Sequence, residues 1–418
     1  MSNAEPKVRS TPRLLWNARS RYARVLGTVR EIQQALWRHR ELLRESEEDR
    51  RLPMHRDIAA SLAELFRNNG GAWIKFAQFL SCRPDLLPPP YIEAFTALRD
   101  QAPPARFDDV QPWLTELLGR DWADHFSAFN IIPVACASIA QVHRGCLRDR
   151  GEVAVKLQLP QVRAEFSQDA AALRALARLL APMLREVDLR QVVEQLIRTT
   201  EEELDFSLEA DNMERFAALP HMPGIHVPKV YRELSAGRIL VTEWIEGISL
   251  SRLLEDDPDR ARPLLERLMS SYLQQVLEFG FFHADPHPGN FIVMPDDSLA
   301  VLDFGAIQQI SDAQRRDYTA LLLRLLGRGD APLQPLFEAA GFGGLDEQRL
   351  ERLSAMLIRA RETEETLADN LNRMMQEFRQ LRLMIPDPFV SVVRVLITMG
   401  GLLNRHGITF QWAALGDG

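Results

Sequence analysis

The stretch His283-Ala284-Asp285-Pro286-His287-Pro288-Gly289-Asn290 decides the fold class of this chain, together with Asp303-Phe304-Gly305, which begins thirteen residues after Asn290. Amide and carboxylate oxygens, such as those of Asn290 and Asp303, are ligands that suit Mg²⁺. Asp285 lies in the same loop and is expected to orient an attacking hydroxyl or to accept its proton. The two motifs therefore predict a magnesium-dependent site that acts on phosphate.

A lysine on a predicted strand precedes these motifs. Residues 152–157 read as a strand that carries Lys156, although lysine occurs at only four positions, Lys7, Lys75, Lys156 and Lys229. A strand lysine, an Asp-x-x-x-x-Asn loop and Asp-Phe-Gly, in this order, match the protein-kinase arrangement, in which the lysine neutralises phosphate charge. We expect Glu209, in the acidic helical run 201–210, to be its partner. The alternative, an incidental lysine among surface acids, explains this order poorly.

The two histidines of the loop have two interpretations. His283 and His287 could bind a metal ion, but His283 stands where the kinase loop usually has a histidine and is expected to anchor the loop. We therefore favour structural roles for both histidines.

The rest of the chain alternates between helical and strand patterns. Two short apolar runs between residues 282 and 302 flank a turn at 295–297, and the chain is mainly helical after residue 246. The periodicity predicts further helices over 58–80, 161–184 and 189–216 and a strand over 238–244.

The helix predicted over 58–80 carries Lys75 and Gln78. These residues are three positions apart and therefore share one helical face. Small residues nearby would permit another segment to approach closely: Gly70, Gly71, Ala72 and Ala77. Taken alone, Lys75 and Gln78 are more simply interpreted as an exposed polar pair.

Residues 13–50 predict a basic amphipathic helical region. Residues 1–40 carry nine basic side chains against two acidic ones. The favoured interpretation is a helix that packs on the domain and exposes an arginine face to solvent. The alternative is a helix that contacts an anionic lipid surface. Apolar residues recur there at helical spacing: Leu14, Leu15, Tyr22, Leu26, Val29, Ile32, Leu36 and Trp37.

The composition excludes several classes of protein. The chain has 418 residues, 46% of them hydrophobic and 26% charged, which predicts two or three globular domains and argues against disorder. A net charge of −8 argues against a nucleic-acid-coating protein, so no nucleic-acid partner is expected. Three cysteines without a C-x-x-C pair favour a reducing, cytoplasmic compartment. The longest apolar stretch, 389–403, is short for a membrane span and contains Arg394, so no transmembrane segment is predicted.

Together these residues resemble the UbiB/AarF-domain family of atypical protein-kinase-like proteins. The resemblance covers residues 62–405 and rests on three features: a Lys-x-Gly-Gln-type element from Lys75 to Gln78, an alanine-rich loop in place of a glycine-rich one, and the 283–290 stretch. It implies an α+β, bilobal protein-kinase-like fold with a helical N-terminal extension (1–120), an N-lobe (121–244) and a helical C-lobe (245–418).

The resemblance also implies roles for individual residues. Lys156 and Glu209 would form the ion pair that holds the phosphates of ATP or ADP, Asn290 and Asp303 would bind Mg²⁺, and Asp285 would hold the catalytic position. The other implied elements are the loop over the phosphates (Ala135, Cys136, Ala137, Ser138), the hinge against adenine (Glu243, Trp244, Ile245), and Lys75 and Gln78 folded over the site where a peptide lies in ordinary kinases.

Two departures from common patterns bear on these roles. A glycine-rich loop is flexible and gives its backbone access to phosphates, whereas alanines at 135, 137 and 140 stiffen the loop, which favours a different nucleotide preference or slow turnover. Ala77 stands where the family motif usually has glycine, and its methyl group would limit how closely the element packs.

Three functions are compatible with the resemblance. The favoured one is a Mg-dependent ATPase or small-molecule kinase that supports ubiquinone or isoprenoid lipid metabolism, with an isoprenoid or quinone-precursor lipid, a membrane surface and biosynthetic enzymes as partners. Location would then be cytoplasmic, with peripheral attachment to the inner membrane face. The second is a nucleotide-binding pseudokinase scaffold. The third, a protein kinase, is disfavoured because the chain lacks a Gly-x-Gly-x-x-Gly loop and an Ala-Pro-Glu motif after Asp-Phe-Gly.

Overall fold

The computed structural model describes residues 12–42, 48–81, 83, 86–98, 104–137, 139–160, 162–181, 189–325, 330–346, 348–350, 352–353, 366–381 and 383–408. The chain forms two compact units, each treated by itself below. Unit 1 comprises Met1–Trp122, Asn130–His143 and Lys156–Leu204, and unit 2 comprises Ala123–Phe129, Arg144–Val155 and Asp205–Gly418. The domain boundaries expected at residues 120 and 244 stay predictions.

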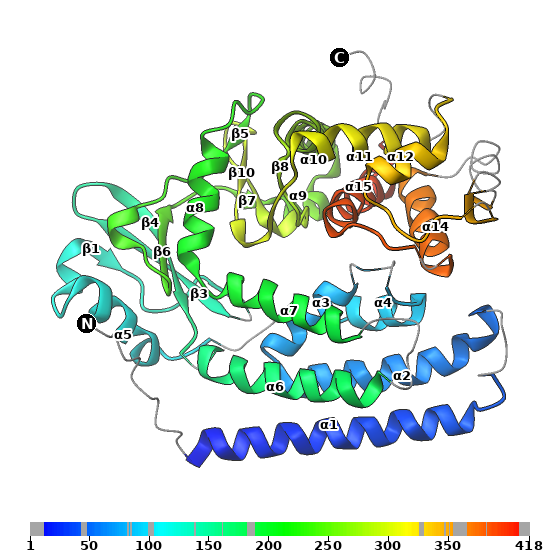
Figure 1. Cartoon of the computed structure of the whole chain (residues 1–418). Helices are drawn as coiled ribbons and strands as arrows, with labels where there is room; N and C mark the ends of the chain where they lie inside the picture. Colours follow the sequence, from blue (N-terminus) through cyan, green and yellow to red (C-terminus); the bar gives the residue numbers. More distant parts are fainter. Residues whose placement is uncertain are drawn as a thin grey trace, which may run out of the picture. The chain divides into compact units, whose positions relative to one another are not determined.

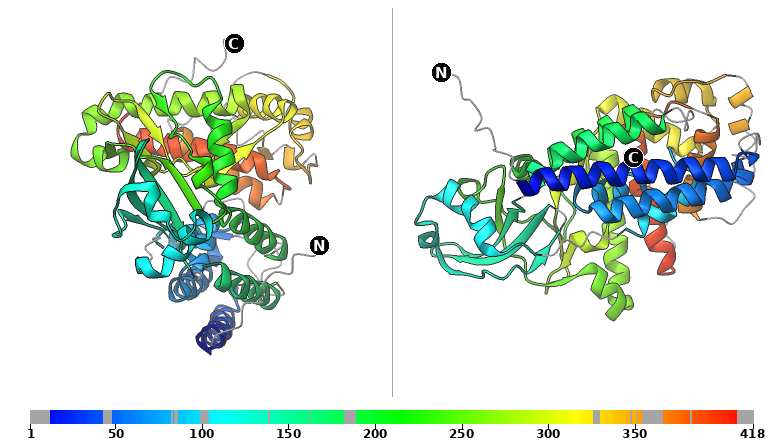
Figure 2. Two further views of the ribbon diagram at one scale, coloured as in Figure 1. Left: turned by 90° about the vertical axis from the view of Figure 1, so that its left-hand side faces the viewer. Right: turned by 90° about the horizontal axis from the view of Figure 1, so that it is seen from below.

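Unit 1 is mainly helical (Figure 1). α1 lies alongside α2 and α6, and α3 lies against α4, α6 and α7 (Figures 1 and 2). Its helices are α1 (Pro12–Arg38), α2 (Glu48–Asn69), α3 (Ala72–Ser81), α4 (Pro89–Thr96), α5 (Phe107–Leu118), α6 (Val162–Leu180) and α7 (Leu189–Glu203).

Two predicted helices are each interrupted, so their predicted bounds are wrong. The helix over 58–80 is two helices, because Gly70 and Gly71 have φ angles of +64° and +50°, which a continuous α-helix cannot contain. The region 13–50 likewise divides into α1 and the start of α2. The helix over 189–216 ends at Glu203, and a new helix begins at Phe206, where the Asp205 carboxylate accepts a hydrogen bond from the Ser207 amide as an N-cap.

The packing of α1 confirms the favoured interpretation in part. Val25, Val29 and Ile32 are buried against the rest of unit 1. Arg21 is buried instead of solvated, because it pairs with Glu165 at 2.9 Å and Asp169 at 3.0 Å on α6. The expected solvated arginine face is therefore wrong for Arg21. Beside the buried face, α1 exposes large apolar side chains, Tyr22, Leu26 and Trp37.

Unit 1 also contains a short strand pair that precedes Lys156. β2 (Ala135–Cys136) runs antiparallel to the first half of β3 (Ala140–Leu147), with Ala135 opposite Val142 and Cys136 opposite Gln141. Ser138, predicted in this loop, lies outside the described residues.

Unit 2 contains three sets of strands. One sheet has the order β1-β3-β4-β6, the second the order β5-β10-β9-β7, and β8 pairs with β11. The strand predicted over 152–157 is confirmed as part of β4, and the two apolar runs after residue 282 include the hairpin β9–β10. The bounds are β1 (Phe126–Phe129), β4 (Gly151–Gln158), β5 (Ile225–His226), β6 (Ile239–Glu243), β7 (Ile248–Ser249), β8 (Phe281–His283), β9 (Phe291–Val293), β10 (Leu299–Val301) and β11 (Ile307–Gln309).

Unit 2 also contains helices in the described part of the chain. They are α8 (Phe206–Ala217), α9 (Leu250–Asp256), α10 (Pro258–Gln274), which continues as the π-helical turn η4 (Gln275–Phe279), α11 (Asp312–Leu325), α12 (Leu333–Ala339), α14 (Leu367–Gln380) and α15 (Asp387–Arg405). Short 3-10 turns are η2 (Trp122–His125), η3 (Arg232–Leu234), η5 (Pro288–Asn290) and η6 (Phe304–Ala306).

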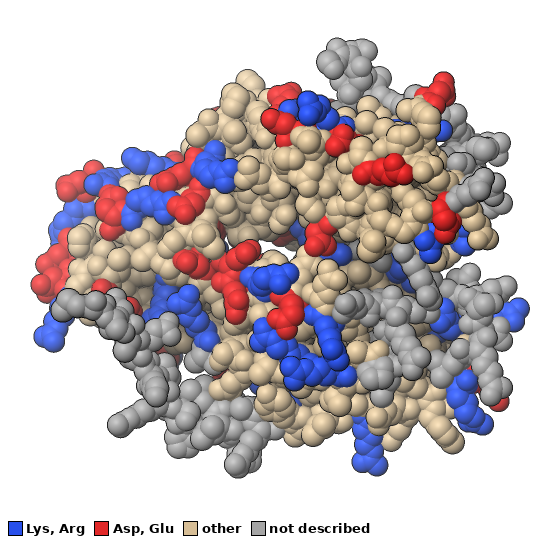
Figure 3. Space-filling model, in the orientation of Figure 1, with Lys and Arg blue, Asp and Glu red and all other residues tan. Residues whose placement is uncertain are grey.

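One of the described helices, α15, is long and apolar enough to cross a membrane, and 56% of its most apolar window is buried in the structure. A buried core helix meets the same criterion. On the face drawn in Figure 3, positive and negative side chains are interspersed among uncharged ones, a pattern typical of a solvated protein surface.

Candidate functional site

The loop that carries Asp285 connects β8 to β9, and each of these strands pairs with a different strand of unit 2. β8 is buried, and its residues pair in antiparallel register with β11, with His283 opposite Ile307. After the loop, β9 pairs with β10, with Phe291 opposite Val301. Because the β9–β10 hairpin folds the chain back on itself, the ends of these two strands bring Asp303 near the loop. The Leu302 amide donates to the Asn290 carbonyl at 2.8 Å, which closes this end of the hairpin.

Asp285 and Asn290, predicted as a functional pair, are in direct contact. The Asn290 Nδ2 donates to Asp285 Oδ2 at 3.0 Å and to the Asp285 carbonyl oxygen at 3.2 Å. The Asp285 side chain is exposed and Asn290 is half-buried. Because the nitrogen of the Asn290 amide faces Asp285, the amide oxygen is directed elsewhere and is the atom able to meet a cation.

Asp303 has an unusual backbone conformation for a residue other than glycine. Its φ angle is +56°, in the left-handed region, and its carboxylate caps η6 through the Gly305 amide at 3.4 Å. The side chain is exposed. Non-glycine residues held in this region are found preferentially at functional sites, which supports the predicted metal-binding role.

His283 joins the loop to the Asp-Phe-Gly segment. Its ring is fully buried, its Nε2 donates to the Asp303 carbonyl at 2.7 Å, and its Nδ1 accepts from the Asp285 amide at 3.2 Å. These partners assign the proton of a neutral ring to Nε2. The Gln275 side chain accepts from the His283 amide at 3.0 Å. The prediction that His283 anchors the loop is confirmed.

His287 has a local structural role as well. Its Nδ1 accepts from the Gly289 amide at 3.0 Å and so caps η5. The part of the chain that the structure describes contains no cluster of three or more His, Cys, Asp or Glu side chains that could hold a metal ion by themselves. The alternative of a histidine metal site is therefore not supported there.

α8 carries Glu209 and is attached to the Asp-Phe-Gly segment. Glu209 is 6% exposed and lies in the first turn of the helix. One turn later, the Asn212 Nδ2 donates to the Phe304 carbonyl at 3.1 Å, and the ring of Phe216 meets the ring of Phe304 edge-on at 5.2 Å. Lys156 belongs to unit 1, so its pairing with Glu209 stays a prediction.

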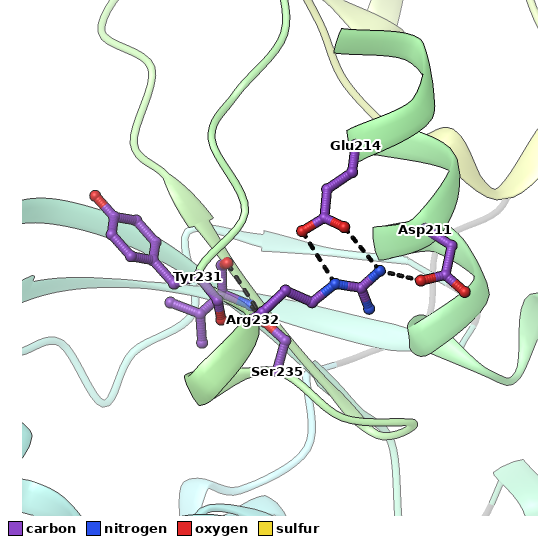
Figure 4. Close-up of polar contacts among 6 residues, drawn as sticks. Asp211, Glu214, Tyr231, Arg232 and Ser235 are labelled. Atoms are coloured by element: carbon purple, nitrogen blue, oxygen red, sulfur yellow. Dashed lines mark hydrogen bonds and ion pairs between the residues drawn. The ribbon is translucent and has the colours of Figure 1, made fainter. Parts of the chain in front are cut away.

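A cluster of one arginine and two acidic residues lies on the exposed face of α8 (Figure 4). Arg232, in η3, donates from Nε and Nη2 to the two carboxylate oxygens of Glu214, each at 3.1 Å, and it also pairs with Asp211. The hydrogen bonds with Glu214 raise the pKa of Arg232 above its ordinary value. Ser235 steadies the same turn by donating to the Tyr231 carbonyl at 2.8 Å. α8 is therefore held from its exposed side as well as at Phe304.

The predicted hinge uses its side chains for contacts within the protein. The Glu243 carboxylate accepts from His226 Nε2 at 3.0 Å and from the Lys229 amide at 3.2 Å. Trp244 donates from Nε1 to Glu246 at 3.0 Å, and the Arg144 guanidinium lies 4.6 Å from its ring centroid. Ile245 is half-buried. The predicted contact of Glu243, Trp244 and Ile245 with adenine stays a prediction.

In unit 1, Lys75 is paired instead of exposed. Its Nζ lies 3.3 Å from Glu203 Oε2 at the end of α7, and both side chains are less than a quarter exposed. The interpretation of Lys75 and Gln78 as an exposed polar pair is wrong for Lys75, and Gln78 is half-buried. Ala77 is fully buried, so its methyl group is accommodated. Trp73, on the same helix, donates to Asp169 on α6 at 2.8 Å.

The loop predicted to cover the phosphates is also in unit 1. Ala135 and Ala137 are exposed and Cys136 is half-buried, and burial raises the pKa of the Cys136 thiol above its ordinary value. Lys156 lies on β4, as predicted, and is half-buried. The roles of these residues toward a nucleotide stay predictions.

Several residues that support the loop were not predicted from the sequence. They include Asn212, Gln275 and Arg394, and Arg394 donates from Nη2 to the Ala284 carbonyl. A charge inside an otherwise apolar helix was the available signal for Arg394, whereas nothing local marks Asn212 or Gln275.

Comparison with known proteins gives a consistent result. The model of the ABC1 atypical kinase-like domain matches residues 97–333. An uncharacterized protein of Synechocystis is 32% identical over 368 residues, which is 82% of this chain and 52% of that protein. The chloroplastic protein ACTIVITY OF BC1 COMPLEX KINASE 1 of Arabidopsis thaliana is 31% identical over 357 residues, 82% of this chain and 52% of that protein. The chain thus spans about half the length of these two relatives.

A solved structure is similar in fold. The complex of Rv3197 with erythromycin from Mycobacterium tuberculosis matches with a TM-score of 0.57 and 28% sequence identity, over 81% of this chain and 90% of that chain.

Proposed function

Because this chain belongs to the ABC1 (UbiB/AarF) family of atypical kinase-like proteins, which has a kinase-like fold of mixed helix and sheet, we propose that it binds a magnesium-bound adenine nucleotide and transfers or hydrolyses its terminal phosphate. The observation that carries the proposal is the contact between Asp285 and Asn290, with Asp303 held beside them through His283. The family relationship supports phosphotransferase-type chemistry in general, and the particular reaction is our proposal.

The side chains present fit Mg²⁺. Asp303 offers an exposed carboxylate from a constrained backbone, and Asn290 has its amide oxygen directed away from Asp285. Magnesium prefers oxygen ligands and keeps several waters, so one carboxylate and one amide beside substrate phosphates are a suitable donor set. When bound, the ion neutralises charge on the phosphate oxygens.

Asp285 is positioned to take a proton. Its Oδ2 is occupied by Asn290, and among the described residues no group donates to its Oδ1. Oδ1 can therefore accept the proton of a hydroxyl or water whose oxygen attacks the terminal phosphorus. The bond from that phosphorus to the bridging oxygen breaks, and the nucleoside diphosphate leaves. A water acceptor gives hydrolysis, and a substrate hydroxyl gives phosphoryl transfer.

For the acceptor, we propose a small molecule of the isoprenoid or quinone-precursor class, handled with biosynthetic enzymes. The resemblance described above supports this class. The Mycobacterium tuberculosis structure, which holds erythromycin, supports binding of a small molecule by a protein of this fold. Lys156 and the alanine-rich loop belong to the same proposal. In it, Lys156 would pair with Glu209 and the loop would lie over the phosphates of the nucleotide.

We also propose peripheral contact with an anionic membrane through α1. Tyr22, Leu26 and Trp37 are exposed at positions that share one helical face, and Trp37 is 71% exposed. Exposed arginines flank them, and the guanidinium of Arg40 lies 5.2 Å from the Trp37 ring centroid. Aromatic and leucine side chains next to arginines suit the boundary of an anionic bilayer.

Vesicle flotation tests the membrane proposal. The variant Leu26→Ser/Trp37→Ser should float less with phosphatidylglycerol vesicles than the unchanged protein does. Leu179→Ser, which alters an exposed leucine on α6, is the matched control and should float normally. Equal flotation of all three proteins would remove α1 as the contact.

Turnover measurements test the phosphate chemistry. Asp285→Asn should lower phosphate release or transfer by at least about 100-fold, because it removes the proton acceptor, while nucleotide binding persists. Asp330→Asn, at an exposed position between α11 and α12, is the control and should keep full activity. Nucleotide binding without any turnover in the unchanged protein would instead support the pseudokinase scaffold.

A further inference from the structure

α15 is the apolar core helix of unit 2, and it carries one charge in its interior. Of its 19 residues, Asp387 and Arg405 are charged at the ends and Arg394 is charged in the middle. The neighbours of Arg394 along the helix, Val393 and Val395, are almost fully buried. The Arg394 side chain itself is half-buried. A guanidinium at such a position is costly unless it is paired or hydrogen-bonded, so its partners are informative.

The partner of Arg394 is the loop that carries Asp285. Its Nη2 donates to the carbonyl oxygen of Ala284, which is 1% exposed and immediately precedes Asp285. Protein kinases have an arginine at the position of Ala284, in the motif His-Arg-Asp. Here the alanine is followed by Asp285, and a guanidinium reaches the loop from a helix 110 residues further along the chain.

A buried tyrosine marks the same place. Tyr272, on α10, is 1% exposed, and its hydroxyl has no hydrogen-bond partner among the described residues. Burial first, and then the charge of Asp285, raise the pKa of Tyr272 well above its ordinary value, whereas the charge of Arg394 lowers it. The ring of Tyr272 meets Phe291 edge-on at 6.3 Å. The Tyr272 hydroxyl is therefore near enough to both Asp285 and Arg394 for their charges to act on it.

We propose that Arg394 is a positioning residue for Asp285. By holding the Ala284 carbonyl, it fixes the backbone from which Asp285 projects toward Asn290. The inference rests on the proposed function, in which Asp285 accepts the proton. It adds a requirement for α15, which sequence motifs alone do not connect to the loop.

Kinetics provide the first test. Arg394→Met keeps much of the side-chain volume and suits an apolar helix, so the variant is expected to fold. We expect kcat to fall about 10- to 100-fold, as when a catalytic group is misplaced, while the nucleotide Kd stays within about twofold. Arg394→Lys keeps the charge but loses the planar guanidinium, and its kcat should lie between those of Arg394→Met and the unchanged protein.

Hydrogen exchange provides a second test that does not depend on turnover. In the nucleotide-free protein, peptides covering Phe281–Asn290 should exchange faster in Arg394→Met than in the unchanged protein, because the loop loses its anchor. Arg405→Met, at an exposed end of the same helix, is the matched control and should exchange normally.

The outcomes separate this inference from the proposed function. Unchanged loop exchange in Arg394→Met overturns the positioning role, whether or not the protein turns over. A rise in exchange spread evenly over α10 and α15, without recovery in Arg394→Lys, also overturns it, because it shows a general packing role. If the unchanged protein lacks turnover but its loop depends on Arg394, the proposed function fails and the positioning contact stands.

Discussion

Asp169 should make the stability of the folded protein depend on pH, with a size and sign that follow from the structure. It is buried on α6, where it meets Arg21 Nε at 3.0 Å and Trp73 Nε1 at 2.8 Å. Burial raises its pKa to about 6, with a smaller contribution from Glu165, even though Arg21, Trp73 and Arg24 favour the ionised form. The cost of ionising this carboxyl in the folded state therefore exceeds the gain from its partners.

The variant Asp169→Asn isolates this effect. Its amide oxygen can still accept from Trp73, and Arg21 keeps Glu165 at 2.9 Å. Because the folded-state pKa of Asp169 lies above its unfolded value, the carboxyl stabilises the unchanged protein most at low pH, and this contribution is lost as the pH rises through about 6. The stability difference, unchanged protein minus variant, should thus fall by about 2 kcal/mol between pH 4.5 and pH 7.5.

Urea denaturation of both proteins at several pH values measures this difference. The NMR resonance of the Trp73 indole N–H offers a direct check of the pKa of Asp169. Because the chain has seven tryptophans, the variant Trp73→Phe is used to assign this signal. That resonance should titrate with a midpoint near pH 6 in the unchanged protein and stay constant in Asp169→Asn. A stability difference that rises with pH, or a midpoint below about pH 4, would refute the reasoning, because the pairing with Arg21 would then outweigh the cost of burial.

Three further changes test individual contacts in unit 2, each by urea denaturation. Tyr272→Phe removes a buried hydroxyl without a described partner, so stability should stay equal or rise by up to about 1 kcal/mol; a clear loss would show that the hydroxyl is satisfied. Arg232→Gln should cost about 1 kcal/mol, since its acidic partners on α8 are partly exposed, and an unchanged stability would show that the cluster does not hold α8. Gly247→Ala should cost more than about 2 kcal/mol, because a methyl group there would overlap the Val293 carbonyl; a loss under half of that would contradict the close approach.

The proximity of Asp285, Asn290 and Asp303 was predictable from the sequence, because one short loop and one short hairpin connect them. Asp285 and Asn290 lie in one tight loop, and Asp303 returns to them after the β9–β10 hairpin. Residue types and spacing were therefore sufficient. The pairing of Lys156 with Glu209 involves separate units and stays a prediction.

The remaining features depend on tertiary contacts or on backbone geometry. Helical periodicity continues past Gly70 and Gly71, so only their positive φ angles reveal the break between α2 and α3. The burial of Arg21 follows from acids on α6, more than 140 residues away. Arg394 contacts the loop across 110 residues. No local pattern encodes such long-range partners.

The most direct test of the central claim is calorimetric binding of ATP and ADP, with and without Mg²⁺, to the unchanged protein, Asp303→Asn and the control Asp330→Asn. We predict that Mg²⁺ tightens nucleotide binding to the unchanged protein and to Asp330→Asn at least about tenfold, and that Asp303→Asn loses this gain because it lacks the metal-binding carboxylate. Binding to Asp303→Asn with the same Mg²⁺ dependence as the unchanged protein would contradict the assignment of the site.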